Sequence, residues 1–109
     1  MNTYDDRLFD AIGDATRRAI LARLLDGPLA VGELADEFTI SRPAISQHLR
    51  ILKDADFVLD RAEGTRRLYE LKADGFASLR EYFDPFWTYA LYAFKRKVEG
   101  RKVKVKGKR

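Results

Sequence analysis

The chain of 109 residues contains no cysteine and a single histidine. The missing cysteine excludes disulfides, thiolate metal sites and thiol-based redox sensing. No unbroken apolar run approaches the roughly 20 residues that a membrane-spanning helix needs, so no membrane partner is expected. The first ten residues, "MNTYDDRLFD", carry acids where a signal peptide carries basic residues, and we therefore expect a cytoplasmic protein.

Acidic residues are scarce only at the C-terminal end. The net charge is +4, but residues 95–109, "KRKVEGRKVKVKGKR", hold nine basic groups and one acid. The preceding 94 residues therefore carry a net charge of −4. Because the basic balance belongs mostly to this tail, any prediction of DNA binding depends on local clusters of charge in the body of the chain.

Apolar spacing predicts a mainly helical domain with one hairpin. Helices are expected over 4–13, 15–26 (with Ala19, Ile20, Leu24 and Leu25 inward), 31–38, 41–54 and 74–99, and strands over 57–61 and 66–71 around Gly64. Asp14 and Ser41 are predicted N-caps, whereas Ala30 offers no acceptor at the start of its helix. The short turn "TIS" before Ser41 is typical of a helix-turn-helix. This order predicts a winged helix-turn-helix domain over residues 1–99, followed by a basic, disordered tail over 100–109.

The helix over 41–54 separates apolar from polar residues on a helical wheel. One side holds Ala44, Ile45, Leu49, Ile51 and Leu52. The other side holds Arg42, Pro43, Ser46, Gln47, Arg50 and Lys53.

His48 falls on the apolar side, between Ile51 and Leu52. We interpret it as a packed imidazole that is hydrogen-bonded to a neighbouring carbonyl or hydroxyl. A metal site is disfavoured because zinc needs three or four ligands, and no second histidine exists. No nucleophile or pocket is nominated for a catalytic base, so we expect neither an enzyme nor a cofactor.

The polar side of this helix suits the DNA major groove, where Arg pairs with guanine, Gln with adenine and Ser with either. Gln47, Ser46 and Arg42 are therefore the base-reading candidates, with Arg50 and Lys53 nearer the phosphates. Two alternatives remain at this point: a solvated helix face, or a face that docks on an acidic protein.

The hairpin gathers basic residues near its tip, namely Arg61, Arg66 and Arg67, with Thr65 beside them. A hairpin next to a recognition helix can lay such residues along the DNA backbone or minor groove. The alternative is a solvated hairpin.

The last predicted helix contains seven aromatic residues within "YFDPFWTYALYAF", residues 82–94. One face of a small domain cannot bury so much aromatic surface, which predicts a homodimer. The predicted interface comprises Leu8, Phe9, Phe83, Phe86, Trp87, Tyr89, Ala90 and Phe94. The alternative is a pocket for a small molecule. Pro85 predicts a kink or break, with Asp84 capping the second half of the helix.

Three stretches resemble the ArsR-type winged-helix transcriptional repressors: "LFDAIGDATRRAILARLLDGPLAVGELADEF", "SRPAISQHLRILKDA" and "RRLYEL". The resemblance covers roughly residues 8–72. It implies a homodimer that represses transcription by binding operator DNA, with Ser46 and Gln47 in the central DNA-reading places and the arginines around Gly64 on the wing.

Metal-sensing members of that family carry cysteines in the helix that reads "AVGELADEF" here, or His and Asp ligands on the last helix. The chain has neither the cysteines nor a histidine there, so it resembles the non-metal branch, and any effector ligand stays unknown. Relatives usually have glycine in the middle of the segment "ADF", residues 55–57. Asp56 is therefore expected to adopt a left-handed backbone conformation, which Asp tolerates better than most residues.

Overall fold

The computed structural model describes residues 3–107, and side chains for residues 4–100. The chain divides into two units, Met1–Ala77 and Ser78–Arg109. The predicted domain boundary at residue 99 stays a prediction.

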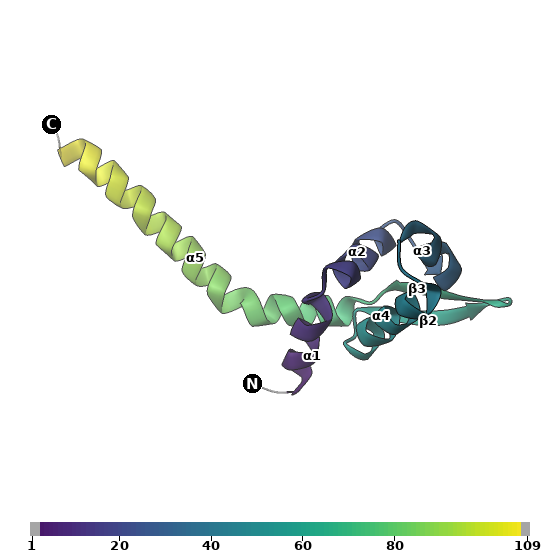
Figure 1. The fold of residues 1–109 in the computed structure, drawn as a ribbon. Coiled ribbons are helices and arrows are strands. Elements are labelled where there is room, and N and C mark those ends of the chain that lie inside the picture. The colour runs from purple at the N-terminus through teal and green to yellow at the C-terminus, as the bar shows by residue number, and fades with distance from the viewer. Residues whose placement is uncertain (1–2, 108–109) are drawn as a thin grey trace. The chain divides into compact units, whose positions relative to one another are not determined.

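The elements follow the predicted order, with one addition (Figure 1). They are α1 (Thr3–Ile12), α2 (Ala15–Leu24), β1 (Leu29–Ala30), α3 (Val31–Glu37), α4 (Arg42–Asp54), β2 (Val58–Glu63), β3 (Arg66–Leu71) and α5 (Ala73–Gly107). The strands form an antiparallel sheet in the order β1-β3-β2. A mainly helical chain with a hairpin beside a helix-turn-helix is a winged helix-turn-helix fold, as predicted.

The strand β1 was not predicted from the sequence. It pairs with β3 through Leu29 opposite Tyr69 and Ala30 opposite Leu68. Two residues are too few to show an alternating pattern, and their extended conformation depends on a partner about 40 residues further along the chain. The hairpin itself is confirmed, with Glu63 opposite Arg66. Gly64 begins its two-residue turn with a φ of 63°, a conformation that glycine adopts readily.

The helix α2 begins as predicted, because the Asp14 carboxylate accepts a hydrogen bond of 3.0 Å from the backbone N–H of Arg17. This hydrogen bond lowers the pKa of Asp14. The prediction that Ala19 and Leu25 point inward is wrong: Ala19 is exposed and Leu25 is 74% exposed. The helix ends at Leu24, and its buried residues are Ile20, Leu21 and Leu24.

The helix α3 has no side-chain cap at Ala30, as predicted. Glu33 instead accepts a 2.9 Å hydrogen bond from the Ala30 N–H.

The core of the first unit lies where α1, α2, α3, α4 and the hairpin meet. Fully buried side chains there are Leu8, Ile20, Leu34, Ile45, Leu49, Leu52 and Phe57. Burial of a large apolar side chain contributes about 1.5–3 kcal/mol to the free energy of folding. Of the apolar side of α4 predicted from the wheel, Ile45, Leu49 and Leu52 are buried in the core, whereas Ala44 and Ile51 are only partly buried.

The end of α4 follows the Schellman pattern. Asp56 has a φ of 64°, as predicted. Its N–H donates to the Lys53 carbonyl, and the N–H of Phe57 donates to the Leu52 carbonyl. Leu52 and Phe57 are both fully buried, which supplies the apolar contact typical of this motif. This turn fixes the direction in which the chain leaves α4 to enter the wing.

Gly75, in the first turn of α5, lies against this same turn. A Cβ atom added there would lie 2.8 Å from the Asp56 carbonyl oxygen and 2.9 Å from the Phe57 ring. The Gly75 N–H donates to the Asp56 carbonyl at 2.8 Å. Close approach of the two backbones thus requires glycine at this position, a requirement that no local pattern in the sequence indicates.

The second unit comprises the larger part of α5. The predicted break at Pro85 and the predicted Asp84 cap are wrong, since the helix passes through both positions. Pro85 removes one backbone hydrogen bond, and the turns on either side continue the helix past it. The other predicted outcome, a kink at Pro85, is compatible with a continuous helix and stays a prediction. The backbone helix includes residues 100–107, but side chains from residue 101 onward and residues 108–109 lie outside the described part, so disorder of the tail stays a prediction.

Candidate nucleic-acid interface

The second helix of the helix-turn-helix, α4, begins as its sequence predicts. The Ser41 hydroxyl accepts a hydrogen bond from the Ala44 N–H at 3.3 Å, and Pro43 occupies the first turn, where its missing N–H costs no hydrogen bond. Residues 38–41 separate α3 from α4. The short connection places the start of α4 at the surface beside α3.

All six residues predicted for DNA contact on α4, five polar residues and one proline, are exposed: Arg42, Pro43, Ser46, Gln47, Arg50 and Lys53. The core-facing residues Ile45, Leu49 and Leu52 are 0% exposed. The helix therefore presents one continuous polar face to solvent, which carries no acid before Asp54, the last residue of the helix.

Two arginines on this face have no ion pair within the described part of the chain: Arg42 and Arg50. The Arg42 guanidinium lies over Gly32 of α3, 3.8 Å from where a Cβ would stand. Both guanidinium groups can therefore bind an anionic ligand without breaking an ion pair to a carboxylate of the protein.

The wing comprises β2, β3 and their turn, residues 58–71. Arg61, Thr65, Arg66 and Arg67 are all exposed, and each arginine has an acidic partner. Within the hairpin, Arg61 pairs with Glu63 at 3.0 Å and with Glu70 at 3.2 Å. These two carboxylates raise the pKa of Arg61.

Two further ion pairs connect the wing to the helices. Arg66 Nη2 lies 2.8 Å from Oε1 of Glu33 in α3. Asp60 of β2 binds Lys53 of α4 at 2.8 Å and Arg67 of β3 at 3.4 Å. The predicted phosphate-contacting residues Lys53, Arg66 and Arg67 are thus already paired in the protein without DNA, which the sequence did not indicate.

His48 faces inward and is partly buried, as predicted, but the predicted hydrogen-bond partner is wrong. The partner is neither a carbonyl nor a hydroxyl: Nη1 of Arg17 lies 3.2 Å from His48 Nδ1. Arg17 also donates to the carbonyls of Ala11 at 2.8 Å and Asp10 at 2.9 Å. The guanidinium therefore joins α1, α2 and α4 behind the polar face.

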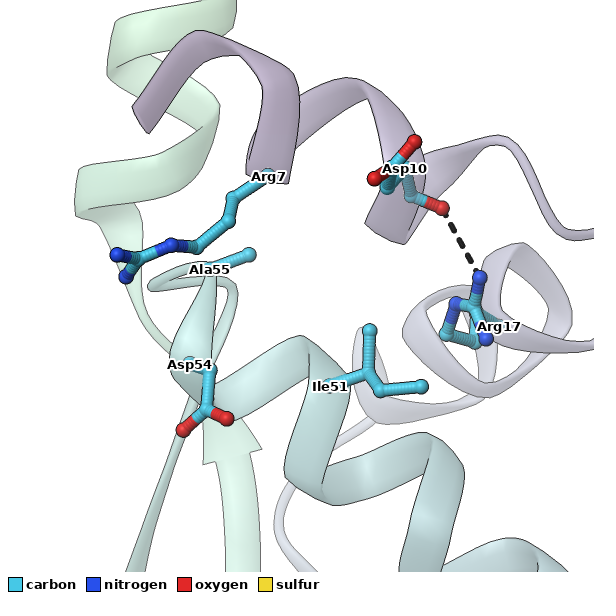
Figure 2. A pocket seen from close by; sticks show the side chains of 6 residues that line it. All are labelled: Arg7, Asp10, Arg17, Ile51, Asp54 and Ala55. Carbon is cyan, nitrogen blue, oxygen red and sulfur yellow. Dashed lines mark hydrogen bonds between the residues drawn. The ribbon is translucent and has the colours of Figure 1, made fainter. Parts of the chain in front are cut away.

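A pocket of about 480 Å³ lies on the same side of α4, between that helix, α1 and α2. Figure 2 shows its lining residues: Arg7, Asp10, Arg17, Ile51, Asp54 and Ala55. Ile51 lines the pocket from α4, and the Arg17 guanidinium donates a hydrogen bond to the Asp10 carbonyl at 2.9 Å. Two arginines and two aspartates give the lining both signs of charge. This mixed lining therefore does not indicate whether a ligand of the pocket would be an anion or a cation.

The predicted dimer residues on α5 are exposed, as a surface for a partner requires. Trp87 is 63% exposed, Phe94 67% and Tyr89 71%. Leu8 must be removed from the predicted set, because its side chain is 0% exposed in the core of its own chain. Phe9 is only partly buried.

Within the described residues, no group of three or more His, Cys, Asp or Glu side chains is arranged to hold a metal ion. In the same range, no helix combines the length and apolar character needed to cross a membrane.

An exposed polar face on the second helix of a helix-turn-helix, with an arginine-bearing hairpin beside it, defines a winged-helix DNA-binding protein. Residues 14–59 match the family model described as "Bacterial regulatory protein, arsR family". The HTH-type transcriptional regulator Rv2034 of Mycobacterium tuberculosis is 52% identical over 101 residues, which cover 91% of this chain and 94% of that protein. The chain belongs to the ArsR family of transcriptional regulators.

Two further comparisons agree with this assignment. The transcriptional repressor SdpR of Bacillus subtilis is 44% identical over 66 residues, which cover 61% of this chain and 73% of that protein. A crystal structure of an ArsR family transcriptional regulator matches with a TM-score of 0.72 at 28% identity, over 79% of this chain and 89% of that one. The resemblance found in the sequence is confirmed, and the chain is a DNA-binding transcriptional regulator.

Proposed function

We propose that two copies of this chain form a cytoplasmic repressor that binds a pseudo-palindromic operator. In each copy α4 enters the major groove and the wing lies along the neighbouring backbone. The observation that carries this proposal is the division of α4 into two sides: its six predicted contact residues are exposed, while Ile45, Leu49 and Leu52 are fully buried. The major groove of B-DNA has room for one such helix.

Within α4, we assign base reading to Arg42, Ser46 and Gln47, whose side chains suit guanine and adenine edges. Arg50 and Lys53 lie further along the helix and suit phosphates, as do Arg61, Thr65, Arg66 and Arg67 on the wing. The body of the chain carries a net negative charge, so binding depends on this local cluster rather than on the overall balance.

The dimer is supported by the apolar surface of α5. Phe86, Trp87, Leu91 and Phe94 are each more than half exposed and recur at helical spacing. Large contiguous apolar surface is uncommon on monomers and marks interaction sites. Two-fold symmetry then predicts half-sites about one helical turn of DNA apart, or a multiple of that spacing.

The test is selection of bound duplexes from a random pool at about 200 mM salt, where purely electrostatic binding is strongly weakened. We expect an enriched sequence with two inverted half-sites. A pool that stays random at this salt would contradict sequence-specific binding, and enrichment of a single half-site would contradict the dimer. The same selection with Gln47→Ala serves as the control that ties enrichment to α4.

A further inference from the structure

We propose that Asp60 is a positioning residue for DNA binding, because its carboxylate holds the wing against the end of the recognition helix. This inference rests on the proposed function, in which α4 and the wing contact the same DNA.

The geometry places one carboxylate between two cations from different elements. Oδ1 of Asp60 lies 2.8 Å from Lys53 Nζ in the last turn of α4, and Oδ2 lies 3.4 Å from Arg67 Nη1 on β3. The Asp60 side chain is 11% exposed, whereas Lys53 is 52% and Arg67 55% exposed. The Asp60 carboxylate is thus buried between α4 and the wing, and the two cations that bind it lie at the surface.

No other carboxylate in the described part of the chain forms ion pairs with both α4 and the wing. Glu63 and Glu70 pair with Arg61 inside the hairpin, and Glu33 connects the wing to α3. Asp60 is also the most enclosed acid among them, since Glu33 is 46% exposed and Glu70 35%. Ion pairs of surface residues contribute little to stability, but screening by solvent weakens as exposure falls.

The hydrogen bond from Lys53 is the main cause that lowers the pKa of Asp60. The carboxylate is consequently ionised at neutral pH and keeps both partners. Base-reading side chains and wing arginines must reach their DNA sites together, and small errors in such placement reduce specificity.

Two effects of this carboxylate on DNA binding have opposite signs. As a negative charge among predicted phosphate contacts, it repels DNA and lowers affinity for every sequence. As a positioning residue, it raises affinity for the operator above that for other sequences. Replacing it by its neutral isostere therefore separates the two effects.

The experiment compares Asp60→Asn with Glu70→Gln, a matched control that also removes one carboxylate charge from the wing but no link to α4. Affinity is measured for the selected operator and for a scrambled duplex over a range of salt concentrations. Asp60→Asn is expected to lower the ratio of operator to scrambled affinity about tenfold, the size of one charge-assisted hydrogen bond. Glu70→Gln is expected to leave that ratio within about twofold. A gain of equal size on both duplexes for Asp60→Asn would overturn the proposal.

A second variant tests the same ion pair in case Asp60→Asn fails to fold. The folding of each variant is checked by circular dichroism. Lys53→Met removes the ion pair between α4 and Asp60 and leaves Asp60 paired with Arg67. We expect it to lower the affinity ratio too, whereas a lysine that only contacts phosphate would lose affinity equally on both duplexes. Equal loss on the two duplexes would count against the positioning role.

Hydrogen exchange without DNA distinguishes this inference from the proposed function. In Asp60→Asn, amides of the wing and of the last turn of α4 are expected to exchange faster than in Glu70→Gln, while α2 is unchanged. If the unmodified chain prefers no DNA sequence, the proposed function fails on that result. Unchanged exchange at the wing would overturn the role of Asp60 whatever the DNA result.

Discussion

Nη1 of Arg17 lies 3.2 Å from Nδ1 of His48, so the only histidine is held by a side chain that donates hydrogen bonds and accepts none. Nδ1 must therefore be the acceptor, and the proton of the neutral ring is expected on Nε2. Long-range ¹H–¹⁵N NMR of the imidazole measures this directly. A ring protonated at Nδ1 and not at Nε2 would contradict the contact.

The same contact predicts an effect on stability. Arg17→Met removes bonds to His48 and to the carbonyls of Ala11 and Asp10, and we expect a loss of about 1–3 kcal/mol in the free energy of unfolding. Urea denaturation measures the loss. The control is Arg18→Met, because Arg18 is exposed and makes one such bond, to the Ile12 carbonyl at 2.7 Å. Equal losses in the two variants would show that Arg17 does not join the helices.

The turn after α4 gives a prediction about the backbone alone. Asp56→Gly and Asp56→Ala both remove the 2.9 Å ion pair with Lys72, so that loss cancels between them. At a φ of 64°, alanine is strained and glycine is not. We expect the glycine variant to be more stable by about 1 kcal/mol, measured as the difference in free energy of unfolding. A more stable alanine variant would contradict the left-handed conformation.

Local patterns in the sequence predicted most of this fold, because caps and apolar spacing act within a few residues. Ser41, Asp14 and the two faces of α4 follow from such short-range rules. The left-handed residue at Asp56 followed from comparison with a family in which glycine is usual. Ala19 and Leu25 were misplaced because the inward face of α2 is centred on Ile20, Leu21 and Leu24, and at 100° per residue both lie outside that face.

The charged contacts could not be predicted in the same way. Arg66 meets a glutamate 33 positions away, and His48 meets an arginine 31 positions away. Such partners depend on how the elements pack, which no local spacing records. The polar face of α4 was consequently found in the sequence, while the ties between that face and the wing, through Asp60, were not.

The ion pairs divide the basic residues into two groups with different expected effects on DNA binding. Arg50 has no ion pair in the described part of the chain, whereas Arg66 is neutralised by Glu33. Arg50→Ala is expected to reduce the slope of log affinity against log salt by about 1, as loss of one phosphate contact does. Arg66→Ala should reduce this slope less, because a guanidinium held by Glu33 must leave that carboxylate before it can contact a phosphate. Titrations at several salt concentrations measure both slopes, and equal changes would show that Arg66 leaves Glu33 when DNA binds.

Gln47 is expected to act on sequence preference rather than on overall affinity. Gln47→Ala should cost about 1–3 kcal/mol on the selected operator and relax preference at one position in each half-site. The measurement is competition between operators that differ at single positions. The scrambled duplex is the control, because it offers no matching base edge. An equal loss on the scrambled duplex would remove Gln47 from the set of base-reading residues.

The aromatic surface of α5 predicts the state of assembly. Trp87 is 63% exposed in the single chain and lies on the stripe that also holds Phe83, Phe86 and Phe94. Trp87→Lys would place a charge in an apolar interface and is expected to convert the dimer to monomers, measured by sedimentation equilibrium. Thr88→Lys adds the same charge to the same helix away from the stripe, and this control is expected to stay dimeric. Because each monomer then meets only one half-site, Trp87→Lys should also weaken operator binding while leaving the affinity for an isolated half-site unchanged. A Trp87→Lys variant that sediments as a dimer would place the interface elsewhere on the chain.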